Sequence, residues 1–148
     1  GTAADPGSEI RLVTIALDSD VLIELINGKN QIVRRHYDEA LVSGRPVVIS
    51  VVVMHEAFFG ALISRRPDHQ AQLIRSFAME HAVVDWTHAD ALSTARVRAE
   101  LERAGSTIGS YDALVAGQAI NRGWIVATGN RREYGRMRDL ELENWTRP

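Results

Sequence analysis

The acidic tripeptide Asp18-Ser19-Asp20 has the residue types and the position best suited to chemistry in this sequence. An apolar run, 13–17, precedes it and is typical of a buried parallel strand. The apolar residues of 21–26 follow, and Asn27-Gly28 then indicates the end of a helix. Asp18 is therefore expected at the carboxyl end of a strand, where α/β sheets bind ligands and a carboxylate can hold a cation or act as a nucleophile. A structural role is equally open, because an aspartate at this point can simply cap the helix.

Two further carboxylates stand out because of their neighbours. Glu56 lies in the mostly apolar segment 54–60, and a buried carboxylate without a partner is costly. A surface arginine or His55 would be a sufficient partner for it. Asp112 falls in the first turn of an expected helix, where the helix dipole stabilises a negative charge. Each carboxylate has an adequate structural explanation when it is considered alone.

The order of apolar runs and of glycine and proline stops predicts an alternation of strands and helices. This alternation is typical of a parallel sheet covered by helices on both faces. Asp18 and Asn130 end predicted strands, and Glu56 and Asp112 lie on helices that can face the same edge. Ser110 is the expected cap of the last long helix, and residues 51–53 fit a strand or a helix. Strands are expected over 13–17, 47–49, 81–84, 124–127 and 140–142, and helices over 21–26, 30–43, up to 63, over 67–80, 88–104 and 110–122.

Composition limits the class of protein. The chain has 148 residues, 45% of them hydrophobic and 24% charged, which suits one ordinary globular domain. Its net charge of −2 argues against a nonspecific nucleic-acid coat protein, although a local arginine cluster can still bind phosphate. The chain has no cysteine, which excludes disulfides and thiolate metal sites and fits a reducing cytoplasm. Lys29 is the only lysine, and the other sixteen basic residues are arginines.

The segment Asp18-Ser19-Asp20-Val21 resembles the first motif of two families. One is the haloacid-dehalogenase-like phosphotransferases, in which Asp18 would be the nucleophile of a phosphatase. That family also needs a downstream lysine and a later acidic pair for Mg²⁺. No lysine follows Lys29 and no adjacent acidic pair follows Asp38-Glu39, so this interpretation fails on two counts. The other family is the PIN-domain ribonucleases.

The chain resembles the VapC-type toxins of prokaryotic toxin–antitoxin pairs, which are PIN-domain ribonucleases, from about residue 14 to residue 145. Three departures concern the site: Asp20 stands where the family often has Asn, Asn130 stands where members have Asp or Asn, and Gly117-Gln118 replaces a commoner small residue and His. These changes affect a second metal position. The matching segments are 17–23, Ser50 with 55–60, 101–116, and 126–134 with 140–145.

The resemblance implies an α/β, PIN-like fold with a central, mostly parallel sheet of about five strands flanked by helices. Residues 13–148 would form this single domain, and residues 1–12 a disordered tail or a remnant of expression. It also implies a divalent-metal-dependent endoribonuclease that hydrolyses RNA phosphodiester bonds as the toxin of a toxin–antitoxin module. The implied partners are RNA, a cognate antitoxin and a second copy in a homodimer, in the cytoplasm and without a membrane.

The implied cofactor is Mg²⁺ or Mn²⁺, hard cations that carboxylate oxygens and waters can hold. The remaining alternative is a non-catalytic binding subunit, in which Asp18, Glu56 and Asp112 are only helix caps and salt-bridge partners. A solvated turn would equally explain the arginines at 131, 132 and 136. By the resemblance, the catalytic and metal-binding residues are Asp18, Glu56 and Asp112, further metal contacts are Asp20, Asn130 and Glu133, and substrate contacts are Ser19, Arg131, Arg132 and Arg136.

Overall fold

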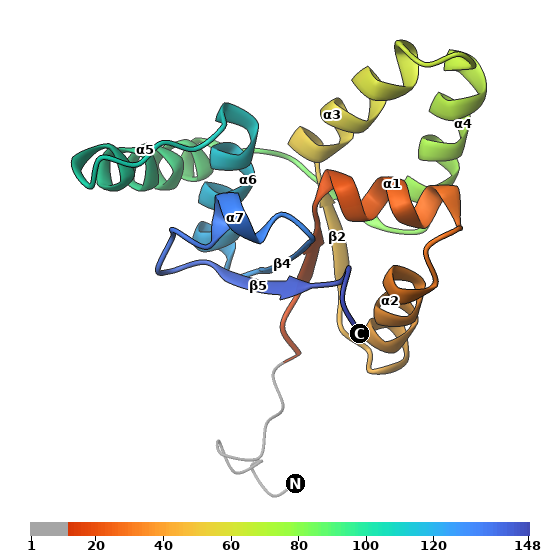
Figure 1. Ribbon diagram of the computed structural model, residues 1–148, viewed down its shortest axis with the longest axis horizontal. Helices are drawn as coiled ribbons and strands as arrows, with labels where there is room; N and C mark the ends of the chain where they lie inside the picture. The colour runs from red at the N-terminus through yellow and green to blue at the C-terminus, as the bar shows by residue number, and fades with distance from the viewer. Residues whose placement is uncertain (1–11) are drawn as a thin grey trace, which may run out of the picture.

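Five short strands form one parallel sheet at the centre of the molecule (Figure 1). The structure is a computed structural model that describes residues 12–148, apart from the side chain of Arg131; residues 1–11 of the expected tail lie outside this part. The α/β class and the parallel sheet are confirmed. The strands are β1 (Ile15–Leu17), β2 (Val47–Ser50), β3 (Ala82–Val84), β4 (Ile125–Thr128) and β5 (Glu141–Asn144), in the spatial order β3-β2-β1-β4-β5.

The helices begin and end largely where the sequence indicates. Gly28 ends α1 in the left-handed conformation, with φ of 70°, and the Asn30 side chain accepts the Ile32 and Val33 amides at the start of α2. In residues 12–148 no helix is both long enough and apolar enough to cross a membrane. The helices are α1 (Ser19–Asn27), α2 (Gln31–Val42), α3 (Val51–Leu62), α4 (Pro67–Ala78), α5 (His88–Arg103), α6 (Ser110–Arg122) and α7 (Arg131–Tyr134).

One predicted cap is wrong, and one boundary that the sequence left open is decided by the structure. The prediction that Ser110 caps α6 is wrong: Gly109 is the N-cap, and Ser110 is the first helical residue, without a side-chain cap. Residues 51–53 are helical, because the Ser50 hydroxyl accepts the Val52 amide at 3.2 Å and so begins α3 directly after β2.

The strand order reverses at β1, and the region at the carboxyl ends of β1 and β4 is called the crevice. The chain moves from β1 to β2 and β3 in one direction and then returns to place β4 on the other side of β1. Right-handed crossovers therefore put α1–α4 on one face of the sheet and α5 and α6 on the other, as Figure 1 shows. Such a reversal separates the loops that leave β1 and β4, and ligands of open α/β sheets bind in the resulting crevice.

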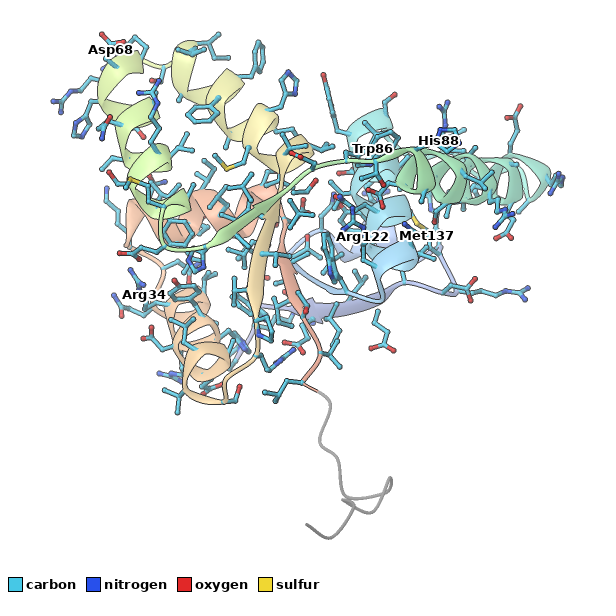
Figure 2. The ribbon with its side chains drawn as sticks, turned by 180° about the vertical axis from the view of Figure 1, so that it is seen from behind. Arg34, Asp68, Trp86, His88, Arg122 and Met137 are labelled. Carbon is cyan, nitrogen blue, oxygen red and sulfur yellow. The ribbon has the colours of Figure 1, made fainter. Side chains whose placement is uncertain are left out.

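The packing of α5 against α6 fixes the helix that carries Asp112. Gly117 is required there, because a Cβ atom would lie 2.5 Å from the Thr94 Cα of α5. The fully buried carboxylate of Asp90, on α5, accepts hydrogen bonds from Asn121 at 2.9 Å and from Arg122 at 3.0 Å, both on α6. Figure 2 labels Arg122 at this helix pair. The α6 helix is thus held rigidly against its neighbour.

Candidate active site

Asp18 lies at the point where β1 becomes α1. It is the N-cap of α1, so its side chain leaves the chain at the carboxyl end of the strand. Its Oδ1 accepts the Ser19 amide at 2.9 Å, and its Oδ2 accepts the Thr128 hydroxyl at 2.8 Å. The side chain is buried, with the residue only 4% exposed. Asp18 therefore both caps the helix and faces the crevice between β1 and β4, so the two interpretations from the sequence are compatible.

The turn after β4 holds a second carboxylate. The Gly129 amide donates to Asp20 Oδ2 at 2.8 Å, and the Asn130 amide donates to the Thr128 hydroxyl at 2.9 Å. A Cβ atom on Gly129 would lie 3.0 Å from Asp20 Oδ2 and 2.6 Å from a methyl group of Thr146. Glycine is thus needed for this close approach of the turn to Asp20.

Glu56 reaches the same crevice from α3. Its Oε2 accepts the Ser19 hydroxyl at 3.5 Å, while its Oε1 is buried and has no hydrogen-bond partner among the described residues. An unpartnered carboxylate oxygen in a buried position costs free energy, because water has been removed and nothing replaces it. The expected surface arginine is absent from the salt bridges of residues 12–148.

Asp112 reaches the crevice from α6 and is held by a tyrosine from α7. The Tyr134 hydroxyl donates to Asp112 Oδ1 at 3.2 Å, and Tyr134 is fully buried. Burial raises the pKa of Tyr134 above its ordinary value, and the negative charges of Asp18 and Asp112 raise it further. The phenol therefore keeps its proton and remains a hydrogen-bond donor.

The carboxyl groups act on one another electrostatically. Burial, and then the charges of Asp20 and Asp112, raise the pKa of Asp18 to about 6. The pKa of Glu56 is raised by burial and then by Asp112. The pKa of Asp112 is also raised, by burial and by the charges of Glu133 and Asp20, although the Tyr134 hydrogen bond lowers it. The crevice thus concentrates negative charge at a cost in stability.

These side chains share a crevice without forming a complete cage for an ion. Among residues 12–148, no group of three or more His, Asp or Glu side chains is arranged so that it could hold a metal. The roles of Asp18, Glu56 and Asp112 as metal ligands therefore stay a prediction. Their oxygen chemistry, mutual repulsion and the unpartnered Glu56 Oε1 suit a hard divalent cation.

The remaining expected site residues are distributed around the crevice. Ser19 links Asp18 to Glu56, and Asn130 and Glu133 are half-buried in the turn and helix that follow β4. Arg132 is exposed, and Arg136 donates to the Thr107 carbonyl at 2.8 Å. The Arg131 side chain lies outside the described part of the chain.

Comparison with known proteins identifies the family to which this chain belongs. The model of the PIN domain matches residues 15–140. The chain belongs to the PIN domain family. It is 34% identical over 135 residues to the tRNA(fMet)-specific endonuclease VapC of Shigella flexneri, covering 91% of this chain and 100% of the relative. It is 31% identical to the protein of the same name from Salmonella typhimurium, covering 90% and 99%. The VapC ribonucleases are thus its relatives within the PIN family.

Solved PIN-domain structures agree in fold. A DNA-bound VapBC from Salmonella typhimurium superimposes with a TM-score of 0.82 at 31% identity, covering 90% of this chain and 98% of that one. VapBC2 from Rickettsia felis, bound to a promoter DNA fragment, gives 0.82 at 26% identity, covering 89% and 98%. The expected PIN-like fold is confirmed, and the haloacid-dehalogenase-like alternative is set aside.

Three residues of this PIN-domain crevice were missed in the sequence. Thr128 and Gly129 directly follow the strand expected over 124–127, and Tyr134 ends the matching segment 126–134, but no role was predicted for any of the three. The position of Thr128 and Gly129 at the carboxyl end of the strand beside β1 was an available signal. The hydrogen bond from Tyr134 to Asp112 joins residues 22 positions apart, and no local pattern signals it.

Proposed function

We propose that this PIN domain is the endoribonuclease toxin of a toxin–antitoxin pair, and that it hydrolyses RNA phosphodiester bonds with a bound Mg²⁺ or Mn²⁺ ion. The observation that carries the proposal is the convergence of Asp18, Glu56 and Asp112 on one crevice of a chain related to VapC ribonucleases. The charge of Asp112 raises the pKa of both Asp18 and Glu56. Like charges held this close destabilise a fold unless a cation offsets them.

The chain's own residues supply an anchored set of oxygen atoms. The hydroxyl of Thr128 and the amide of Ser19 fix Asp18, the phenol of Tyr134 fixes Asp112, and the Ser19 hydroxyl contacts Glu56. A divalent ion, when bound, would supply an activated water and offset the charge that develops on the phosphoryl oxygens. The fixed carboxylates would hold and orient that ion and accept the proton released by the attacking water.

RNA is the proposed substrate, and a transfer RNA is the first one to test. Two relatives at 31–34% identity are named for cleavage of tRNA(fMet). Arg132 and Arg136, exposed around α7, would lead the phosphate backbone toward the crevice. An antitoxin is the proposed protein partner, because the VapBC structures from Salmonella typhimurium and Rickettsia felis are toxin–antitoxin complexes. A homodimer is the proposed state of the toxin itself.

The test is cleavage of total RNA across a titration of Mg²⁺ and of Mn²⁺, with sequencing of the new ends. Asp112→Asn is expected to abolish cleavage and to relieve growth arrest in an expressing host, while keeping the fold, because asparagine suits the first turn of a helix. Asp68→Asn is the matched control, because Asp68 is exposed on α4 at the far tip of the α3–α4 hairpin (Figure 2). Full activity of Asp112→Asn, or cleavage that is unchanged in EDTA, would refute the proposal.

A further inference from the structure

Two aromatic side chains stand beside the carboxylates without belonging to the core. His55 precedes Glu56 on α3, and Tyr111 precedes Asp112 on α6. Their ring centroids are 5.4 Å apart and their planes are inclined by 39°. Both residues are exposed, and Tyr111 keeps 48% of its surface accessible. A half-exposed tyrosine is common on protein surfaces, so the informative feature of Tyr111 is its contact with a second exposed ring, one residue before Asp112.

The geometry of the pair determines what it can bind. A flat ring inserted between the two would need centroids about 7 Å apart, twice the ~3.5 Å contact distance between carbon atoms. The observed 5.4 Å leaves no such gap. A planar ligand must therefore stack on the outer face of Tyr111, with His55 supporting the opposite face. This support restricts the rotamers of Tyr111 before binding, which lowers the entropic cost of stacking.

The location of the pair indicates which planar ligand this is. Each ring is carried one residue before a carboxylate of the proposed cleavage site, so ring and carboxylate leave neighbouring positions of the same helix in directions about 100° apart. A group stacked on Tyr111 can therefore belong to the nucleotide beside a phosphate held in the crevice. In RNA, the planar groups next to a phosphate are nucleobases, and proteins bind unpaired bases by stacking them on exposed aromatic rings.

From this geometry we infer that Tyr111, supported by His55, is a stacking platform for an unpaired nucleobase adjacent to the phosphodiester bond that the crevice cleaves. This inference rests on the proposed ribonuclease function and adds a substrate feature to it. Because a base in a duplex is already stacked and paired, the platform selects single-stranded segments and loops. Stacking is tolerant of base identity, so the platform selects conformation more than sequence.

The experiment is a double-mutant cycle that measures the coupling between the Tyr111 ring and the base in RNA binding. Wild-type protein first cleaves RNA with Mn²⁺, and sequencing of the ends locates the scissile phosphate. A short RNA with that site is then prepared intact and with an abasic nucleotide on either side of the phosphate. Binding is measured by fluorescence anisotropy with full-length Asp18→Asn protein, which should leave the RNA uncleaved, alone and combined with Tyr111→Leu.

At one of the two positions, the abasic nucleotide should weaken binding to the parent protein about 5- to 150-fold, the range expected for one stacked base. Tyr111→Leu should weaken binding of intact RNA by a similar factor and reduce the abasic effect to less than about 2-fold. Tyr111→Phe keeps the ring and should retain the full abasic effect, and His55→Ala should weaken binding less than Tyr111→Leu does. Met79→Ala is the matched control and should change nothing, because Met79 is an exposed residue at the C-cap of α4, shortly before the amino end of β3.

The inference is overturned if the abasic effect at both positions is as large in Tyr111→Leu as in the parent. That result would mean that the rings only pack α3 against α6 or contact a protein partner, and RNA cleavage by the wild type would still support the proposed function. Absence of cleavage in the first step would instead overturn the proposed function, and the platform with it.

Discussion

The same substitution at two buried aspartates should have opposite effects on stability. Asp18 and Asp90 are both buried, at 4% and 0% exposure. Around Asp18 the charges of Asp20 and Asp112 add to the effect of burial and raise its pKa. Burial also acts to raise the pKa of Asp90, but hydrogen bonds from Arg122, from the Thr87 amide and from Asn121 outweigh it and hold that pKa well below its usual range. We predict that Asp18→Asn stabilises the metal-free protein and that Asp90→Asn destabilises it.

The size of the first effect follows from the pKa of Asp18. A rise from 3.8 to about 6 is worth about 3 kcal/mol between the two protonation states. The folded state binds this proton more tightly than the unfolded state, so the contribution of Asp18 to stability is most favourable below pH 3.8, falls as pH rises to about 6 and stays reduced above it. Asparagine removes that loss but weakens the contact with the Thr128 hydroxyl, at a cost of about 1 kcal/mol. The net gain near neutral pH is about 2 kcal/mol, or roughly 4–8 °C in Tm.

The assay is thermal unfolding followed by circular dichroism, in EDTA, at pH 7.5 and at pH 4. The advantage of Asp18→Asn should be present at pH 7.5 and nearly vanish at pH 4, where Asp18 is protonated in the folded wild type. Asp90→Asn should lower Tm at pH 7.5, because it leaves Arg122 without its carboxylate partner. If Asp18→Asn lowers Tm at pH 7.5 as Asp90→Asn does, the claim that charge repulsion strains the crevice is refuted.

Three further predictions use four single substitutions. Gly117→Ala should destabilise the protein by about 1–3 kcal/mol in urea unfolding, because its Cβ overlaps α5; an unchanged midpoint would contradict this packing. Tyr134→Phe removes the hydrogen bond that lowers the pKa of Asp112, so the acid limb of the pH–rate profile for RNA cleavage should move to higher pH, with the rate at pH 8 little changed. Glu133→Gln should raise the Mn²⁺ concentration needed for half-maximal cleavage and Asn130→Asp should lower it; curves that coincide with the wild type would show that neither residue supports the ion.

Much of the fold could be predicted because its signals are local. Gly28 and Gly123 end α1 and α6 in the left-handed conformation, which glycine adopts most readily. The alternation of apolar runs with helices predicted the parallel sheet, and a parallel sheet requires its strand ends to meet at one edge. The position of Asp18 at the crevice followed from these two facts, without knowledge of any tertiary contact.

The boundaries that the sequence left open or placed wrongly are those where two local structures compete. The contacts that it did not predict join residues far apart along the chain. Val51–Val53 suit a strand or a helix, and the Ser50 hydroxyl decides in favour of the helix. A serine before a helix is a common cap, yet at Ser110 the helix begins one residue earlier than the pattern indicates. The hydrogen bond from Thr128 to Asp18 joins residues 110 positions apart, so only the assembled sheet brings them together.

The electrostatics of the crevice bear on the order in which the proposed cation and RNA would bind. The carboxylates are positioned by neutral donors, namely the amides of Ser19 and Gly129 and the hydroxyl of Thr128. None of these donors carries a full positive charge that could neutralise a carboxylate. An RNA phosphate brought to this crevice adds another negative charge in a partly buried place, where repulsion is poorly screened. Under the proposed function, a cation would therefore have to bind before the RNA or together with it. A base stacked on the neighbouring ring of Tyr111 would hold the strand without adding charge. Under the proposed function, Tyr111 would bind the nucleobase, and Asp112, the next residue on α6, would help to hold the cation that neutralises the phosphate.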